Sequence, residues 1–447
     1  MSDRLDSSPW RPMHTRIAGA LGIGWMLDAF EVQIIGSLIP SIAAEFGLSQ
    51  TQQVAVFVIW FVGIMLGALL FGYLADRVGR RRLFVATLIM YSIAAVLTAL
   101  SPNYAIFMVF RFITALGVGG EYSAVCSAIS EFLPARNRGR IGAVVMNFWA
   151  VGGILAGLVS ILFISTLLGE SGWRYALLFG ALSGVYGLYA RRLIPESPRW
   201  LAARGRNEEA NAAITEITGI EREHAQFAPV ELNRSLRANL SELWQKHRGR
   251  LLFGMALDFS EAAGYYGLFT FLAVFILVPG VVDVAPSTVP YYFLVANVGA
   301  LAGGFLVAWL LDRAGRKPTV TFSYLLAAAS VIVLAAVATT GSPVATLFAF
   351  TGAVFFATCA WVSAYPTFSE LFPTHLRATG VGASVAVGRT GAIIGQIVLA
   401  ELALSFGLWS AFLLLAGFWL IGAAAGLIWW IRGVEARGMS LEALAEA

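Results

Sequence analysis

Long apolar segments separated by short polar connections run through almost the whole 447-residue chain. A helix needs about 20 apolar residues to span the roughly 30 Å hydrocarbon core of a bilayer. Segments of that length predict twelve membrane helices: 16–39, 54–75, 83–100, 104–128, 141–168, 173–193, 250–278, 288–311, 318–340, 343–366, 380–404 and 408–431. The pattern therefore predicts an all-α polytopic membrane protein.

The longest hydrophilic segment divides these helices into two sets of six. We expect an N-terminal six-helix bundle over 1–193, a cytoplasmic loop with short helices over 194–249, and a C-terminal six-helix bundle over 250–447. Within the loop, 202–217 has the pattern of an amphipathic helix.

Composition and charge agree with this class. Only 13% of the residues are charged and 58% are hydrophobic, whereas about a quarter of a soluble domain is charged. The basic residues behind the net charge of +4 lie in alternate connections between the helices. We therefore attribute them to the orientation of the chain in the membrane and predict no nucleic-acid partner. The positive-inside rule then places both termini and the long loop in the cytoplasm. The basic residues concerned are Arg77, Arg80, Arg81, Arg82, Arg136, Arg138, Arg140, Arg313, Arg316, Lys317 and Arg377.

Three sequence features recur in the same order in both halves. Parallel repeats of this kind are typical of transporters whose substrate site lies between the halves, near the middle of the membrane. The pairs are G-x-x-L-D-x-x-E at 24–31 and 254–261, an Asp-Arg loop with Gly and basic residues at 76–81 and 312–317, and E-F-L-P or E-L-F-P at 131–134 and 370–373.

The first of these features places carboxylates inside membrane helices. Asp28 and Glu31, and again Asp258 and Glu261, are three residues apart and so share a helix face. A carboxylate at this depth costs a few kcal/mol, so it is usually functional. Arg111 lies at nearly the same depth as the first pair and is expected to contact one of them. An ion pair favours the charged acid and burial alone favours the neutral acid. An acid that alternates between the ion pair and burial without a partner can release and bind a proton, and so carry it across the membrane. The alternative is that the acid and Arg111 form a static ion pair.

Arg389, in the eleventh predicted helix, is the candidate for binding the substrate. A guanidinium stays charged and its planar shape matches a carboxylate through two parallel hydrogen bonds. Asp258 and Glu261 lie at a similar depth, and we predict a role for them in proton coupling. The alternative is that one of these acids simply neutralises Arg389.

Aromatic side chains in the same region are candidates for the rest of the site. Such rings can stack on a flat substrate or donate a hydrogen bond to a carboxylate. The alternative is that they only pack or lie at the membrane interface. The candidates are Tyr265, Tyr266, Trp361, Tyr365 and Trp149.

The loop motifs resemble those of the major facilitator superfamily, over essentially the whole chain. G-x-L-A-D-R-x-G-R-R at 72–81 is similar to the superfamily signature, and P-E-S-P-R-W-L at 195–201 resembles the sugar-porter and organic-ion-transporter branches. Within those branches, D-A-F-E at 28–31, F-W at 148–149 and G-Y-Y-G at 264–267 are similar to bacterial aromatic-acid and nicotinate proton symporters, which are relatives of organic-anion transporters and synaptic-vesicle glycoproteins. The resemblance implies two pseudo-symmetric bundles in a bacterial inner membrane. It also implies an anionic substrate, because organic-anion members carry a basic residue in the eleventh helix.

The resemblance further implies a cytoplasmic gating network that holds the halves together and releases them. The alternative is that these residues set topology and form surface ion pairs. Glu121, near the cytoplasmic end of the fourth predicted helix, is expected to belong to the network and not to the substrate site. The network is predicted to contain Asp76, Arg80, Glu121, Glu131, Arg138, Asp312, Arg316, Glu370 and Arg377.

Together these features predict a proton-coupled symporter that works as a monomer. It would import small organic anions, namely monocarboxylates that include aromatic or pyridine carboxylates, by alternating access. The first alternative is a transporter of organic cations or drugs. The second is a sugar porter, which is disfavoured because residues 258–261 read D-F-S-E where sugar porters carry a Gln-Gln pair. The third is a non-transporting sensor of the same fold. The cysteines and histidines lack metal-ligand spacing and no nucleophile–base pair is visible, so we predict no enzyme, metal or cofactor.

Overall fold

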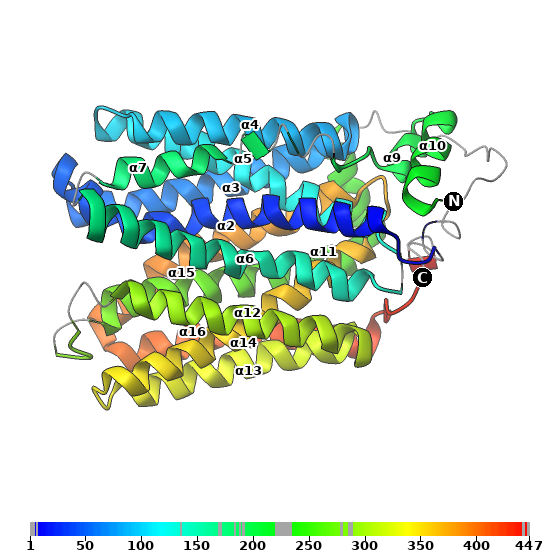
Figure 1. Cartoon of the computed structure of the whole chain (residues 1–447). Coiled ribbons are helices and arrows are strands. Elements are labelled where there is room, and N and C mark those ends of the chain that lie inside the picture. The colour runs from blue at the N-terminus through cyan, green and yellow to red at the C-terminus, as the bar shows by residue number, and fades with distance from the viewer. Residues whose placement is uncertain are drawn as a thin grey trace.

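The computed structural model describes residues 5, 8–134, 136–168, 172–182, 185–186, 189, 193–219, 235–277, 280–284, 289–439 and 443–444. Helices dominate this part of the chain, and no β-strand occurs in it. Figure 1 shows the long helices running along one common direction. The predicted all-α class is confirmed.

Two groups of long helices form the molecule. The first group contains α2 (Pro12–Phe46), α3 (Gln50–Val78), α4 (Arg80–Ala99), α5 (Tyr104–Phe132), α6 (Arg138–Ser160) with the π-helical η1 (Ile161–Leu168), and α7 (Gly172–Leu178) with the 3₁₀ turn η3 (Phe179–Ala181). The second contains α11 (Leu236–Phe271) with the π-helical η4 (Leu272–Ile276), α12 (Val289–Arg313), α13 (Arg316–Ala338), α14 (Pro343–Leu371), α15 (Arg377–Phe406) and α16 (Leu408–Arg432). In Figure 1 the first group fills the upper part of the view and α12, α13, α14 and α16 the lower part, with α11 and α15 between them.

Ten helices of the described part are long and apolar enough to cross a membrane. Two further predicted spans are not among these ten. The predicted span 173–193 is described only in part, as α7, η3 and a few residues beyond them. The predicted span 250–278 forms the later part of α11 and η4.

The connection between the groups is more helical than its composition suggests. The predicted helix over 202–217 is observed as α10 (Asn207–Thr218), after a short α9 (Pro198–Ala203). Gly205, with a φ of 73°, separates these two helices. α11 begins at Leu236, where Ser235 caps it by accepting a hydrogen bond from the Ala238 N–H group. Non-helical backbone at His247 then separates this first part of α11 from the membrane span.

The repeated Asp-Arg loops form matching tight turns. Gly79, with a φ of 107°, joins α3 to α4, and Gly315, with a φ of 90°, joins α12 to α13. Backbone of positive φ is strained for residues with a side chain, so both copies of the motif need glycine at this position.

The two groups meet mainly along two helix pairs, α3 with α15 and α6 with α12, with further contacts of α14 with α5 and α6 and of α15 with α5. In the second pair, the Asn147 side chain of α6 fills the space over Gly304 of α12, where a side chain on residue 304 would overlap it. Figure 1 shows both chain ends, α9 and α10 at one end of the bundle.

Candidate substrate site and gate

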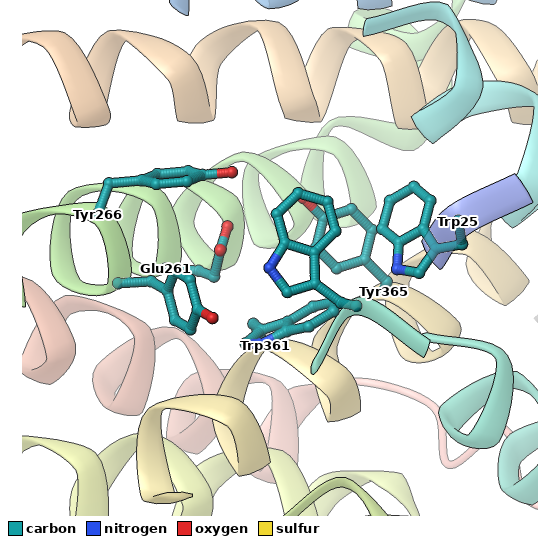
Figure 2. A pocket seen from close by; sticks show the side chains of 7 residues that line it. Trp25, Glu261, Tyr266, Trp361 and Tyr365 are labelled. Carbon is teal, nitrogen blue, oxygen red and sulfur yellow. The ribbon is translucent and has the colours of Figure 1, made fainter. Parts of the chain in front are cut away.

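A small cavity lies between the two groups of helices, with a volume of about 10 Å³, roughly the room of one water molecule. Its walls come from α2, α6, α11 and α14 and are mostly aromatic. The lining residues are Trp25, Trp149, Glu261, Tyr265, Tyr266, Trp361 and Tyr365. In Figure 2 the Glu261 carboxylate points into the space between these rings.

The structure brings all five predicted aromatic residues to this cavity. Their rings contact one another at edges: Trp149 and Trp361 have centroids 5.8 Å apart, and Tyr265 lies 6.4 Å from Trp361. Tyr266 also packs against Phe61 of α3, 4.7 Å away, which joins the two halves beside the cavity. The rings of this shell therefore pack against one another and nearly fill the space between the two halves.

Arg389 of α15 lies directly behind this lining. Its Nη2 atom donates a 3.4 Å hydrogen bond to the Tyr365 hydroxyl, and its guanidinium carbon lies 5.5 Å from the centre of the Tyr266 ring. Its Nη1 atom is 3.6 Å from Glu261 Oε2 and 3.8 Å from Asp258 Oδ2. Two acids therefore share one arginine at the edge of the cavity.

A glycine beside Arg389 makes room for one of these acids. A Cβ atom on Gly388 would overlap Asp258 Oδ2. The Asp258 carboxylate therefore occupies the space that a side chain at residue 388 would fill. The same arrangement occurs in the first half, where a Cβ atom on Gly180 would overlap Glu31 Oε1.

The charged pair of the first half is Glu31 with Arg111. Arg111 Nη1 lies 3.6 Å from Glu31 Oε2, and Nη2 donates a 3.1 Å hydrogen bond to the Glu31 backbone carbonyl. The Arg111 guanidinium also stacks on Trp60, 3.6 Å from the ring centre. Depth along the helices left Asp28 and Glu31 as alternatives, and this structure has Glu31 as the partner.

Asp28 and Glu121 form a separate buried acidic site. The Asp28 carboxylate faces the Tyr91 hydroxyl and interacts electrostatically with Glu121. The Thr87 hydroxyl donates a hydrogen bond to Glu121. Glu121 is thus placed beside Asp28 and not among the loop residues, and its membership of the gate stays a prediction.

At the end of the bundle where α9 lies, Asp76 connects the halves. Its Oδ2 atom accepts a 2.9 Å hydrogen bond from the Thr379 N–H group and a 2.5 Å hydrogen bond from the Thr379 hydroxyl. Thr379 is in the first turn of α15, where backbone N–H groups lack partners in their own helix and favour a negative charge. Trp200 of α9 donates a further 2.9 Å hydrogen bond to the Asp76 backbone carbonyl.

Glu131 makes a second connection at the same end. Its Oε1 atom lies 3.4 Å from Arg377 Nη1 of the other half, and its Oε2 atom accepts a 2.5 Å hydrogen bond from the Ser197 hydroxyl. Arg199 donates a 2.5 Å hydrogen bond to the Glu131 backbone carbonyl. The P-E-S-P-R-W-L segment therefore holds Glu131 in position through Ser197 and Arg199.

Three further network residues, Asp312, Arg316 and Glu370, belong to the second copy of the loop motifs. Arg316 contacts Glu370 through hydrogen bonds of 3.0 and 3.2 Å, and its guanidinium covers Gly139 of the first half. Asp312 accepts a hydrogen bond from the Arg140 backbone N–H group. The side chains of the predicted network residues Arg80 and Arg138 lie outside the described part of the structure.

Sequence reasoning missed several residues at these sites. Trp25 lines the cavity, but nothing in its sequence context separates it from a packing aromatic. The amides Asn147, Gln33 and Asn297 also connect the halves. Asn147 donates to the Leu301 carbonyl at 2.8 Å, and Asn297 donates to Gln33 at 3.3 Å. Amides in apolar helices are a usable signal, because they commonly hydrogen-bond between helices.

Two helix bundles around a central cavity, joined by paired loop motifs, define a membrane transporter of the major facilitator fold. The chain belongs to the sugar (and other) transporter family, whose model matches residues 19–447. It is 30% identical to the niacin transporter NiaP of Acinetobacter baylyi, over 99% of this chain and 98% of that protein. It is also 30% identical to the putative niacin/nicotinamide transporter NiaP of Bacillus subtilis, over 87% of this chain and 88% of that protein.

The solved structures give the same fold. The proton:xylose symporter XylE superposes with a TM-score of 0.80 at 20% identity, covering 97% of this chain and 98% of that chain. The predicted superfamily and fold are confirmed. The chain is therefore a multi-pass membrane transporter and not an enzyme.

Proposed function

We propose that the protein is a proton-coupled symporter that imports a small organic anion, in the class of pyridine and other aromatic monocarboxylates. The observation that carries the proposal is Arg389, which stands behind the cavity wall with Tyr365 and Tyr266 against it. A guanidinium in this position can bind a carboxylate that enters the cavity. The niacin transporters that the chain resembles are named for a substrate of this class.

The lining of the cavity suits a small, flat substrate. In this closed structure the cavity volume is only about 10 Å³, roughly the room of one water molecule, so the cavity must open before a substrate enters it. Its aromatic walls offer stacking faces and two tyrosine hydroxyls, from Tyr265 and Tyr266, on the same helix. In an open state the rings separate and admit the substrate between them.

Competition for Arg389 supplies one route to proton coupling. In the closed cavity Asp258 and Glu261 both lie within 4 Å of Arg389. A substrate carboxylate that replaces one of them leaves that acid buried without its cation, which is costly unless it takes up a proton. Binding of the anion and binding of a proton thereby favour each other.

The first half offers a second proton site. Glu31 pairs with Arg111. Asp28 and Glu121 lie together, and in the described part of the structure neither forms an ion pair with a cation. Complete ionisation of these acids would leave excess negative charge inside the membrane. We propose that Asp28 or Glu31 carries the transported proton. We further propose that the transporter works as a monomer in a bacterial inner membrane, with both termini in the cytoplasm.

The test is uptake into proteoliposomes, with and without an inward proton gradient. Labelled nicotinate, benzoate, a hexose and a quaternary amine are compared. We expect nicotinate or benzoate to accumulate and a protonophore to abolish the accumulation. Uptake of the amine or the hexose alone would overturn the proposal and favour one of the alternative substrate classes.

Variants separate substrate binding from proton coupling. Arg389→Ala should abolish binding of the anion, and Arg389→Lys should restore little of it because the bidentate geometry is lost. One of the two variants Glu31→Gln and Asp28→Asn should lose accumulation driven by the proton gradient. That variant should still exchange labelled for unlabelled substrate. Unchanged anion affinity in Arg389→Ala would remove Arg389 from the site.

A further inference from the structure

The indole N–H group of Trp361 is a hydrogen-bond donor without an acceptor among the described residues. Trp361 lines the cavity and is only 4% exposed. The other two tryptophans of the lining have polar contacts. Trp25 donates a 3.1 Å hydrogen bond to the Met146 carbonyl, and Trp149 interacts with the Tyr265 side chain. Because a buried indole N–H group usually has a partner and is costly without one, the unpaired donor of Trp361 requires an explanation.

The surroundings of Trp361 connect this donor to the substrate site. Its ring contacts those of Trp149, Tyr265 and Tyr365, with centroids 5.8, 6.4 and 6.0 Å apart. All three neighbours line the cavity, and Figure 2 shows Trp361 among the rings of the lining. A substrate that separates these rings therefore comes into contact with Trp361.

Position distinguishes Trp361 from two similar residues. Trp60 and Trp419 also carry buried indole N–H groups without an acceptor in the described part of the chain. Trp60 packs against the Arg111 guanidinium, and Trp419 packs against the Tyr324 ring. Neither of them lines the cavity. A substrate can therefore supply an acceptor to Trp361 and not to these two.

Tyr365 connects the unpaired donor to the arginine that we propose as the carboxylate site. The Tyr365 hydroxyl accepts a 3.4 Å hydrogen bond from Arg389 Nη2, and the Tyr365 ring contacts Trp361. Trp361 in α14 and Arg389 in α15 both belong to the C-terminal half, so they stay together when the halves separate. A planar substrate that lies along Tyr365 can place its carboxylate at Arg389 and the opposite edge of its ring at Trp361.

We propose that the Trp361 N–H group donates a hydrogen bond to a ring nitrogen of the substrate, so that the site prefers pyridine carboxylates to benzoate. This inference rests on the proposed function and narrows its substrate class. An unprotonated pyridine nitrogen accepts a hydrogen bond in the plane of the ring, where benzoate has a C–H group. A site built around a buried donor rejects a substrate that leaves the donor unpaired. The nitrogen must lie away from the carboxylate, as it does in nicotinate and isonicotinate.

Isothermal titration calorimetry of the full purified chain tests this preference. Nicotinate, isonicotinate, picolinate and benzoate are each titrated into the wild type. We expect nicotinate or isonicotinate to bind about tenfold more tightly than benzoate. Picolinate, whose ring nitrogen is next to the carboxylate, should bind like benzoate. Equal affinities for all four acids would overturn this inference and leave the proposed function standing, whereas no binding of any of them would overturn both.

Two variants test the donor itself. Trp361→Phe removes the N–H group and keeps an aromatic ring, so nicotinate should lose about tenfold more affinity than benzoate. The matched control is Trp419→Phe, which removes a buried indole N–H group outside the lining and should keep the preference. Equal losses for the two acids in Trp361→Phe, or a larger loss for benzoate, would mean that Trp361 only packs and would overturn the hydrogen bond. If Trp361→Phe does not fold, the four affinities of the wild type decide.

Discussion

The hydrogen bonds between Asp76 and Thr379 offer the sharpest test of how the halves are held together. Both side chains are buried, and one carboxylate oxygen accepts two hydrogen bonds from the other half, at 2.9 and 2.5 Å. Asp76→Ala removes both bonds. Thr379→Ala removes the hydroxyl bond and keeps the backbone N–H bond.

The expected size of the effect follows from these two bonds. A hydrogen bond to a charged group contributes about 1.5–3 kcal/mol. The lower value applies here, because both groups regain water when this end of the bundle opens. Losing two bonds then costs the closed state about 3 kcal/mol, which is roughly a 100-fold shift towards the open state. Thr379→Ala should shift it about tenfold.

Double electron–electron resonance measures this shift directly. Spin labels at Val78→Cys of α3 and Arg248→Cys of α11 report the separation of the two halves, in a chain whose Cys126 and Cys359 are replaced by alanine. The variants should enlarge the population with the longer distance, Asp76→Ala more than Thr379→Ala. The combined variant should resemble Asp76→Ala, because the hydroxyl has then no carboxylate to contact. Distance distributions that do not change in either single variant would refute the assignment of this contact to the gate.

Three further changes probe other contacts of the protein. Glu45, near the end of α2, accepts hydrogen bonds from the Arg174 guanidinium at 2.5 Å and from the Trp173 indole N–H group at 2.7 Å. Burial raises the pKa of Glu45, but these hydrogen bonds outweigh it and hold the pKa below the ordinary value of 4.5. The contribution of Glu45 to stability is therefore present at neutral pH and lost as the pH falls through that lowered pKa. The melting temperatures of the wild type and Glu45→Gln should differ at pH 7 and converge in acid, and a difference independent of pH would contradict this reasoning. Trp60→Leu removes a buried cation–π contact worth about 2 kcal/mol, so the free energy of unfolding should fall by a similar amount in a denaturant titration. Gly388→Ala should displace the Asp258 carboxylate and reduce uptake at least tenfold, whereas Gly417→Ala, with open space around its Cβ position, should transport normally.

The sequence was sufficient to predict ten membrane spans of the described part, the repeat and several of the contacts. Length and hydropathy determine a membrane helix, and depth along a helix follows from residue number. The approach of Arg111 to the acids of the first helix could therefore be predicted. The choice of Glu31 over Asp28 could not, because it depends on how α2 and α5 are rotated against each other.

Other features depend on tertiary contacts that leave no local pattern. Gly180 and Gly388 resemble any packing glycine in the sequence, although each gives space to a carboxylate. Thr379 forms its contact only because α15 begins opposite the end of α3. The early start of α11, at Leu236, was missed because the segment before His247 is too polar to read as part of a membrane helix.

The two halves have similar loop contacts but differ in the charged residues at the middle of the membrane. Asp76 accepts a hydrogen bond from the first turn of α15, and Asp312 accepts one from Arg140 in the first turn of α6. Each half therefore contributes one aspartate that binds the start of a helix in the other half. The central arginines differ. Arg111 is covered by Trp60 and contacts one acid, whereas Arg389 contacts two acids and reaches the cavity wall. A substrate carboxylate can therefore compete for Arg389 more readily than for Arg111. This difference is the physical reason for assigning anion binding to the C-terminal half and proton carriage to Asp28 or Glu31 in our proposal.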